Sequence, residues 1–130
     1  MPSSRHRLFL SVAALSALCA GCSGNPGKAP ESKPYSGTLT LAGGQPLGDV
    51  MLHLHPLKPG FAAGAEVDAG GAFASEAPPG DYAWSLRRSE KAKPAASEAA
   101  LKKVPAKYLE TDLSRTVRIG TGSAIAVVVD

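Results

Sequence analysis

The chain has 130 residues, and its 14 Lys and Arg against 11 Asp and Glu give a formal net charge of +3. This length has room for one folded domain. Basic residues adjoin only at Arg87-Arg88 and Lys102-Lys103, so the sequence lacks the dense cationic run that non-specific nucleic-acid binding requires. We therefore expect no nucleic-acid partner.

Residues 1–21 have the three-part form of an export signal. Arg5-His6-Arg7 precedes an apolar run from Leu8 to Leu18, which is too short to span a bilayer as a permanent helix, and small residues follow. Removal of this segment would take away two arginines and leave 12 basic and 11 acidic groups. We therefore expect an exported and nearly neutral mature chain.

Cys22 follows the small pair Ala20-Gly21, an arrangement that resembles the lipobox of bacterial lipoproteins. The resemblance implies that Cys22 is the lipidation site, and that the attached acyl chains hold the protein on the membrane at its periplasmic or cell-surface face. Cys19 stands where a lipobox usually has leucine, so cleavage without lipidation stays open. Cys19 and Cys22 also form a C-x-x-C spacing, but with no second cysteine pair we expect neither redox chemistry nor a metal there.

Residues 22–34 contain several prolines and glycines and no large apolar side chain. Such a segment cannot bury enough apolar surface to become ordered, so it is predicted to be a flexible linker. Its expected reach is roughly 20 Å. The folded domain, predicted to span residues 35–130, would then lie close to the membrane surface.

The stretch from Gly37 to Pro56 predicts two strands around a turn at Gly43-Gly44-Gln-Pro. Apolar and polar residues alternate on both sides of this turn, which is typical of strands with one buried face. We therefore expect a hairpin. Its predicted buried residues are Leu39, Leu41, Val50, Leu52 and Leu54.

Further strands are predicted after the turns at residues 68–72 and 77–81, both of which contain glycine. Tyr82, Trp84 and Leu86 alternate with smaller or polar residues and predict an amphipathic strand. Residues 89–103 are rich in Ala, Lys, Glu and Ser, and either one or two helical turns or a mobile loop fits them. Strands resume at residues 116–119 and, after a turn, at 124–129, where a continuous apolar run favours a central strand.

In order along the chain, these signals resemble the carboxypeptidase regulatory-like, or transthyretin-like, β-sandwich modules of small bacterial surface lipoproteins. The resemblance covers residues 35–130. It implies an all-β, seven-stranded Ig-like or prealbumin-like sandwich without catalytic activity. The motifs that carry it lie at residues 37–41, 44–50, 67–73, 79–84, 104–108 and 124–129.

His53 and His55 are two residues apart on a predicted strand, so their side chains share one side, as in a two-histidine metal site. Glu66 or Asp68 would have to supply a third ligand. The competing interpretation, which we favour, is that alternation places both histidines on the solvent face opposite a buried one. We therefore expect no metal and no cofactor.

Tyr82 and Trp84 could in principle form a platform on which a sugar stacks, but their alternation with buried positions favours core packing. Lys107-Tyr108, after Val104-Pro105, is expected to cap one end of the sandwich. Nucleophile elbows, H-E-x-x-H and phosphate-loop motifs are missing from the sequence. We therefore expect a non-enzymatic structural or protein-interaction module of the cell envelope that uses loops or an exposed edge strand, with binding of a glycan or another small ligand as the alternative.

Overall fold

The computed structural model describes residues 31–120 and 124–130. The predicted export signal, Cys22 and most of the linker lie outside the described residues, as does the centre of the turn predicted before the last strand. The described part contains one α-helix, α1 (Pro94–Leu101), and one 3-10 helix, η2 (Ala106–Leu109). Its seven strands are β1 (Lys33–Leu41), β2 (Val50–Pro56), β3 (Ala63–Val67), β4 (Ala72–Ala77), β5 (Gly80–Arg88), β6 (Thr116–Ile119) and β7 (Ala124–Val129).

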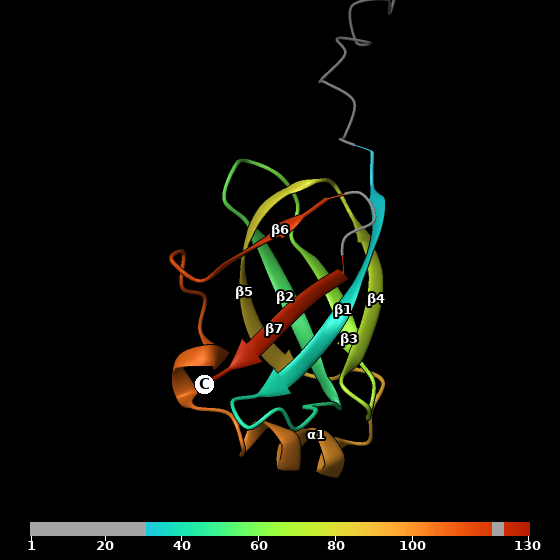
Figure 1. Cartoon of the computed structure of the whole chain (residues 1–130), viewed down its shortest axis with the longest axis vertical. Coiled ribbons are helices and arrows are strands. Elements are labelled where there is room, and N and C mark those ends of the chain that lie inside the picture. Colours follow the sequence, from blue (N-terminus) through green and yellow to red (C-terminus); the bar gives the residue numbers. More distant parts are fainter. Residues whose placement is uncertain (1–30, 121–123) are drawn as a thin grey trace, which may run out of the picture.

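The strands form one continuous sheet in the order β6-β5-β2-β3-β4-β1-β7. Only β1 and β7 run parallel, and every other pair is antiparallel. A single residue pair, Val67 opposite Phe73, joins β3 to β4, so the sheet folds over at this point into two layers. One layer is β7-β1-β4 and the other is β3-β2-β5-β6 (Figure 1). The expected all-β, seven-stranded sandwich is confirmed.

The predicted hairpin between residues 37–41 and 50–56 is wrong. Strand β1 pairs with β4 and β7, whereas β2 pairs with β3 and β5 in the opposite layer. The intervening residues 42–49 cross between the layers, and Leu47, buried within this crossing, donates its backbone N–H to the Leu39 carbonyl. Alternation identified the buried face of each strand correctly, but it carries no information about which strand lies alongside.

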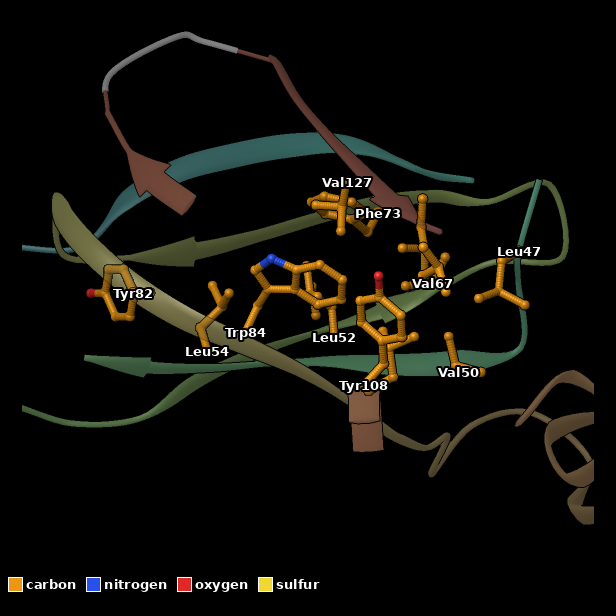
Figure 2. Close-up of a cluster of buried hydrophobic side chains, with 14 of the residues drawn as sticks. Leu47, Val50, Leu52, Leu54, Val67, Phe73, Tyr82, Trp84, Tyr108 and Val127 are labelled. Atoms are coloured by element: carbon orange, nitrogen blue, oxygen red, sulfur yellow. The ribbon is translucent and has the colours of Figure 1, made fainter. Parts of the chain in front are cut away.

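The core lies between the layers, and side chains from β2, β3, β4, β5, β7 and η2 meet in it (Figure 2). Tyr82, Trp84 and Leu86 point into it, as predicted. The amphipathic pattern predicted for β5 is nevertheless incomplete, because Ala83 and Ser85 on its outer face are also buried. Ala83 lies between His55 of β2 and Thr116 of β6, and Ser85 lies beside His53 of β2, so larger neighbours cover both small side chains.

The structure decides between the two alternatives for residues 94–101 and differs from two other sequence-based expectations. The domain begins at Lys33 rather than Tyr35, because Lys33 and Pro34 already pair with β4. Residues 94–101 form the α-helix α1, with Pro94 at its first turn, where a missing N–H costs nothing. Strand β7 lies at an end of the sheet order and not at its centre, although Val127 and Val129 are buried. A continuous apolar run fits a central strand, and it also fits an edge strand whose outer face is apolar. Composition alone therefore could not distinguish these two positions in the sheet.

The predicted turn at residues 68–72 is held by its own side chain and by a glycine. The Asp68 carboxylate accepts hydrogen bonds from the backbone N–H groups of Gly70 and Ala72, at 2.9 and 3.0 Å. Gly71 adopts a φ of 81°, a conformation that residues with a Cβ rarely take. The turn thereby brings β3 and β4 together at the fold between the layers.

Candidate functional site

His53 and His55 lie on the outer face of β2, as the alternation predicted. His53 is half-buried and His55 is exposed. Burial, followed by the nearby positive charge of Arg87 and the neighbouring His55, lowers the pKa of His53 from its usual value. The positions of both histidines therefore fit the interpretation that they are surface residues on the outer face of β2.

The two carboxylates considered as third metal ligands have other partners. Glu66 accepts hydrogen bonds from the Ser89 hydroxyl and from the backbone N–H of Glu90, and Asp68 is occupied by its turn. Within residues 31–120 and 124–130, no cluster of three His, Cys, Asp or Glu side chains is arranged to hold a metal ion. Glu66 instead fixes the start of the segment that leads from β5 into α1.

The sugar platform considered at Tyr82 and Trp84 does not form. Trp84 is only 5% exposed, and its ring stacks on Tyr108 of η2 with centroids 5.4 Å apart. The Tyr82 hydroxyl donates to the Pro78 carbonyl at 2.7 Å, which ties the strand to the preceding turn. Both aromatic residues are therefore structural, and the segment at residues 104–108 covers one side of the core, as expected.

A groove of about 710 Å³ opens at the end of the sandwich where β2 leads into β3 and β4 leads into β5. Its lining is rich in proline and in apolar or aromatic side chains. Phe61 is 79% exposed and Leu57 is 43% exposed, which makes this loop the most apolar part of the described surface at this end. The lining residues are Pro56, Leu57, Lys58, Pro59, Gly60, Phe61, Pro78, Pro79, Gly80, Asp81 and Tyr82.

The groove offers few polar groups to a ligand. Lys58 and Asp81 are its two charged lining residues. The Asp81 carboxylate is engaged by the Arg118 guanidinium at 3.0 Å, and this hydrogen bond lowers the pKa of Asp81. Because the carboxylate already has a partner, the groove is suited to apolar contact and poorly suited to hydrogen-bonded recognition or to proton transfer.

The groove lies where the N-terminal segment enters the domain. Lys33, the first residue of β1, pairs with Ala77, which directly precedes the lining residue Pro78. Figure 1 shows the start of β1 at the same end of the molecule as the loop between β2 and β3, with α1 at the opposite end. The surface closest to the predicted linker is therefore the exposed apolar one.

A second notable surface is the free side of β7. This strand pairs with β1 on one side and with no strand on the other, as far as the described residues go. Ala124, Ala126 and Val128 point outward and are exposed, and the strand contains no proline and no charged residue. The opposite end of the sheet is different, because β6 is only four residues long and carries Arg118.

Sequence reasoning expected contact through loops or an exposed edge strand, but it did not locate either surface. The loop Leu57-Lys58-Pro59-Gly60-Phe61 contains the Pro-Gly pair of a turn flanked by apolar residues, and that combination is the signal that could have drawn attention to it. The position of the loop beside residues 78–82 depends on the pairing of β2 with β5. That pairing is not visible in the sequence.

Comparison with protein-family models, curated proteins and solved structures gives no match to this chain. The resemblance to transthyretin-like modules therefore stays a prediction from the sequence motifs. In the part of the chain that the structure describes, no helix is long and apolar enough to cross a membrane.

Proposed function

We propose that this protein is an exported, lipid-anchored β-sandwich of the carboxypeptidase regulatory-like type, which acts without catalysis as a protein-interaction module of the cell envelope. The lipobox-like position of Cys22 after Ala20-Gly21 and the resemblance to surface lipoproteins support the anchor. The non-catalytic role rests on the missing catalytic motifs, and the interaction role rests on the free side of β7. That last observation carries the functional part of the proposal.

The unprotected edge of β7 is suited to pairing with a strand of another protein. Edge strands in natural proteins are usually shortened, bent or marked with lysine or proline, because an open row of N–H and C=O groups invites pairing. Strand β7 has six residues and contains neither lysine nor proline. Addition of a partner strand to such an edge is a common mode of peptide recognition, in which backbone hydrogen bonds supply affinity.

Two matched substitutions test this mode of binding. Thr38 of β1 lies between Ala126 of β7 and Ala72 of β4, so both alanines occupy the same layer and the same outer face. Ala126→Lys places a charge on the free edge strand, whereas Ala72→Lys places it on the strand that joins the two layers. A photo-reactive amino acid then replaces Ala124 in the full-length protein in cells, and its crosslink identifies the partner.

The expected result is a crosslink that Ala126→Lys abolishes and Ala72→Lys retains. Loss of the crosslink in both variants would indicate docking on the flat face instead of the edge. Crosslinking that neither substitution changes would refute the proposed role of β7. The anchor is tested separately: Cys22→Ala should move the protein from the membrane fraction to the soluble fraction, and continued membrane association would refute lipidation there.

The alternative function, binding of a glycan or another small ligand of the envelope, would use the groove beside Phe61 through ring stacking and apolar contact rather than through hydrogen bonds. The groove is large enough for a small ligand, and Phe61 offers an exposed ring for stacking. Titration of the protein with envelope sugars, followed by the NMR signals of Phe61 and Lys58, tests this alternative. Shifts that Phe61→Ala removes would support it, and unchanged signals would count against it.

A further inference from the structure

We propose that the loop between β2 and β3 contacts the lipid bilayer and that Phe61 enters its headgroup region. This inference rests on the proposed anchor at Cys22. It goes beyond the anchor because it assigns a second membrane contact, made by the folded domain itself. It also fixes the orientation of the sandwich on the membrane.

The position of the loop supplies the first argument. The chain enters β1 at Lys33, opposite Ala77 and next to the groove. A linker with a reach of roughly 20 Å keeps this end of the domain near the bilayer. Strand β1 has nine residues and therefore separates the two ends of the domain by about 30 Å. The groove end is thus held at the membrane, and the end that carries α1 is directed away from it (Figure 1).

The chemistry of the loop supplies the second argument. Phe61 and Leu57 expose apolar area to water, and burial of such area at the membrane interface is favourable. Pro56 and Pro59 restrict the backbone around them, so ordering the loop at the interface costs little conformational entropy. Lys58, between the two apolar side chains, can keep its ammonium group in water while its stem lies along the apolar surface.

Charge at this end of the domain is balanced. Among the described residues, Asp81 pairs with Arg118 at 3.0 Å and Lys33 pairs with Glu31 at 3.4 Å, and the remaining Lys58 and exposed Glu76 carry opposite charges. Electrostatic attraction to anionic lipids therefore contributes little, and we expect apolar insertion to dominate. The contact should persist at high salt and on uncharged lipids, unlike the contact of a polybasic segment.

The test uses the full-length lipidated protein in phosphatidylethanolamine and phosphatidylcholine vesicles that carry brominated acyl chains, which quench nearby tryptophan. Phe61→Trp reports on the loop. Gln45→Trp, an exposed position beyond the other end of β1, is the matched control. The native Trp84 is buried and its emission is subtracted using the unsubstituted protein. We expect the emission of Phe61→Trp to shift to shorter wavelength and to fall about twofold, with no change for Gln45→Trp.

Flotation of the vesicles separates this inference from the anchor. Protein that floats with unquenched Phe61→Trp would overturn the membrane contact and leave the anchor intact. Protein that does not float would overturn both. A shift to shorter wavelength without quenching by bromine would place residue 61 against protein rather than lipid, and would also overturn the inference. Quenching that disappears in 0.5 M salt would refute the apolar mechanism. At that concentration the screening length is ~4 Å, so salt removes electrostatic attraction but leaves apolar contact in place.

Discussion

The rings of Trp84 in β5 and Tyr108 in η2 are stacked, with centroids 5.4 Å apart and planes inclined by 16°. The Tyr108 hydroxyl also hydrogen-bonds to Asp130, which directly follows β7. Arg115 lies over the Tyr108 ring at 4.4 Å and adds a cation–π contact. Because β6 and β7 do not pair, η2 is the element that connects β5 to the end of β7 on this side of the sandwich.

Truncation of Tyr108 should therefore destabilise the whole domain. We expect Tyr108→Ala to lower the free energy of unfolding by about 3–5 kcal/mol, since it removes a buried ring and its stacking contact. Tyr108→Phe keeps the ring and should cost about 1 kcal/mol for the lost hydrogen bonds. Urea denaturation followed by Trp84 fluorescence measures both. Glu110→Ala, at an exposed position directly after η2, is the control, and an equal loss in all three variants would contradict the central position assigned to the ring.

The phase assigned to β2 leads to a second prediction. Leu52 is fully buried between the layers, whereas His53 points outward. Leu52→Ala should cost about 2–5 kcal/mol through lost burial and the cavity that remains, and His53→Ala should cost less than about 1 kcal/mol. Thermal and urea denaturation of the two variants give the comparison. Small and equal effects would show that the assignment of Leu52 to the buried face and of His53 to the outer face is wrong.

Much of this fold could be predicted from alternation, because which residues of a strand are buried is a local property. The buried faces of β1, β2 and β5 follow directly from Leu39, Leu52 and Trp84. Strand partners are not local. The parallel pairing of β1 with β7 joins residues at the two ends of the domain, and nothing in either segment specifies the other. The predicted hairpin failed for that reason.

Close approach of β7 to β1 leads to a third prediction, at Gly37. A Cβ added there would lie 2.0 Å from the Ile125 carbonyl oxygen and 2.6 Å from the Phe73 ring. Gly37→Ala should therefore destabilise the domain by about 1–3 kcal/mol and weaken the pairing of β7. Gly43→Ala is the matched control, since a Cβ at that turn position has open space around it. Hydrogen exchange of the β7 amides distinguishes the two variants, and equal protection would contradict the predicted displacement.

The lowered pKa of His53 leads to a fourth prediction, on the pH dependence of stability. Burial disfavours the charged form, so the pKa in the folded state lies below the unfolded value of about 6.5. Between these two values the unfolded chain binds more protons. The free energy of unfolding therefore falls as the pH drops from 7 through this window and levels off below the folded pKa. His53→Gln should remove this slope in urea titrations at pH 5–7, and an unchanged slope would assign it to another group.

The candidate surfaces could be predicted less well than the core. Exposed Phe61 and the open edge of β7 matter because of what surrounds them in three dimensions. A loop with a phenylalanine has no special meaning in sequence until the pairing of β1 with β4 places it beside the entry of the chain. The histidines, by contrast, were conspicuous in sequence because of their residue type, and the structure gives them no third partner among the described residues.

The fifth prediction compares two adjacent valines of β7, which differ only in the face they occupy. Val127 is 2% exposed and packs into the core, and Val128 is 51% exposed on the outer face. Val127→Lys would bury an unpaired ammonium group and should destabilise the domain by more than about 3 kcal/mol. Val128→Lys places the same charge in water and should change stability by less than about 0.5 kcal/mol.

The same pair of variants also separates folding from association at the edge. A lysine on the outer face of an edge strand discourages pairing with further strands. Val128→Lys should therefore keep the urea midpoint of the unsubstituted protein while weakening any concentration-dependent assembly through β7, measured by sedimentation velocity of the Cys22→Ala form. If Val128→Lys unfolds as readily as Val127→Lys, both valines must be buried and β7 has no free outer face. If Val128→Lys is stable and the photo-reactive amino acid at position 124 still crosslinks to the partner at the same yield, the partner does not use the edge of β7.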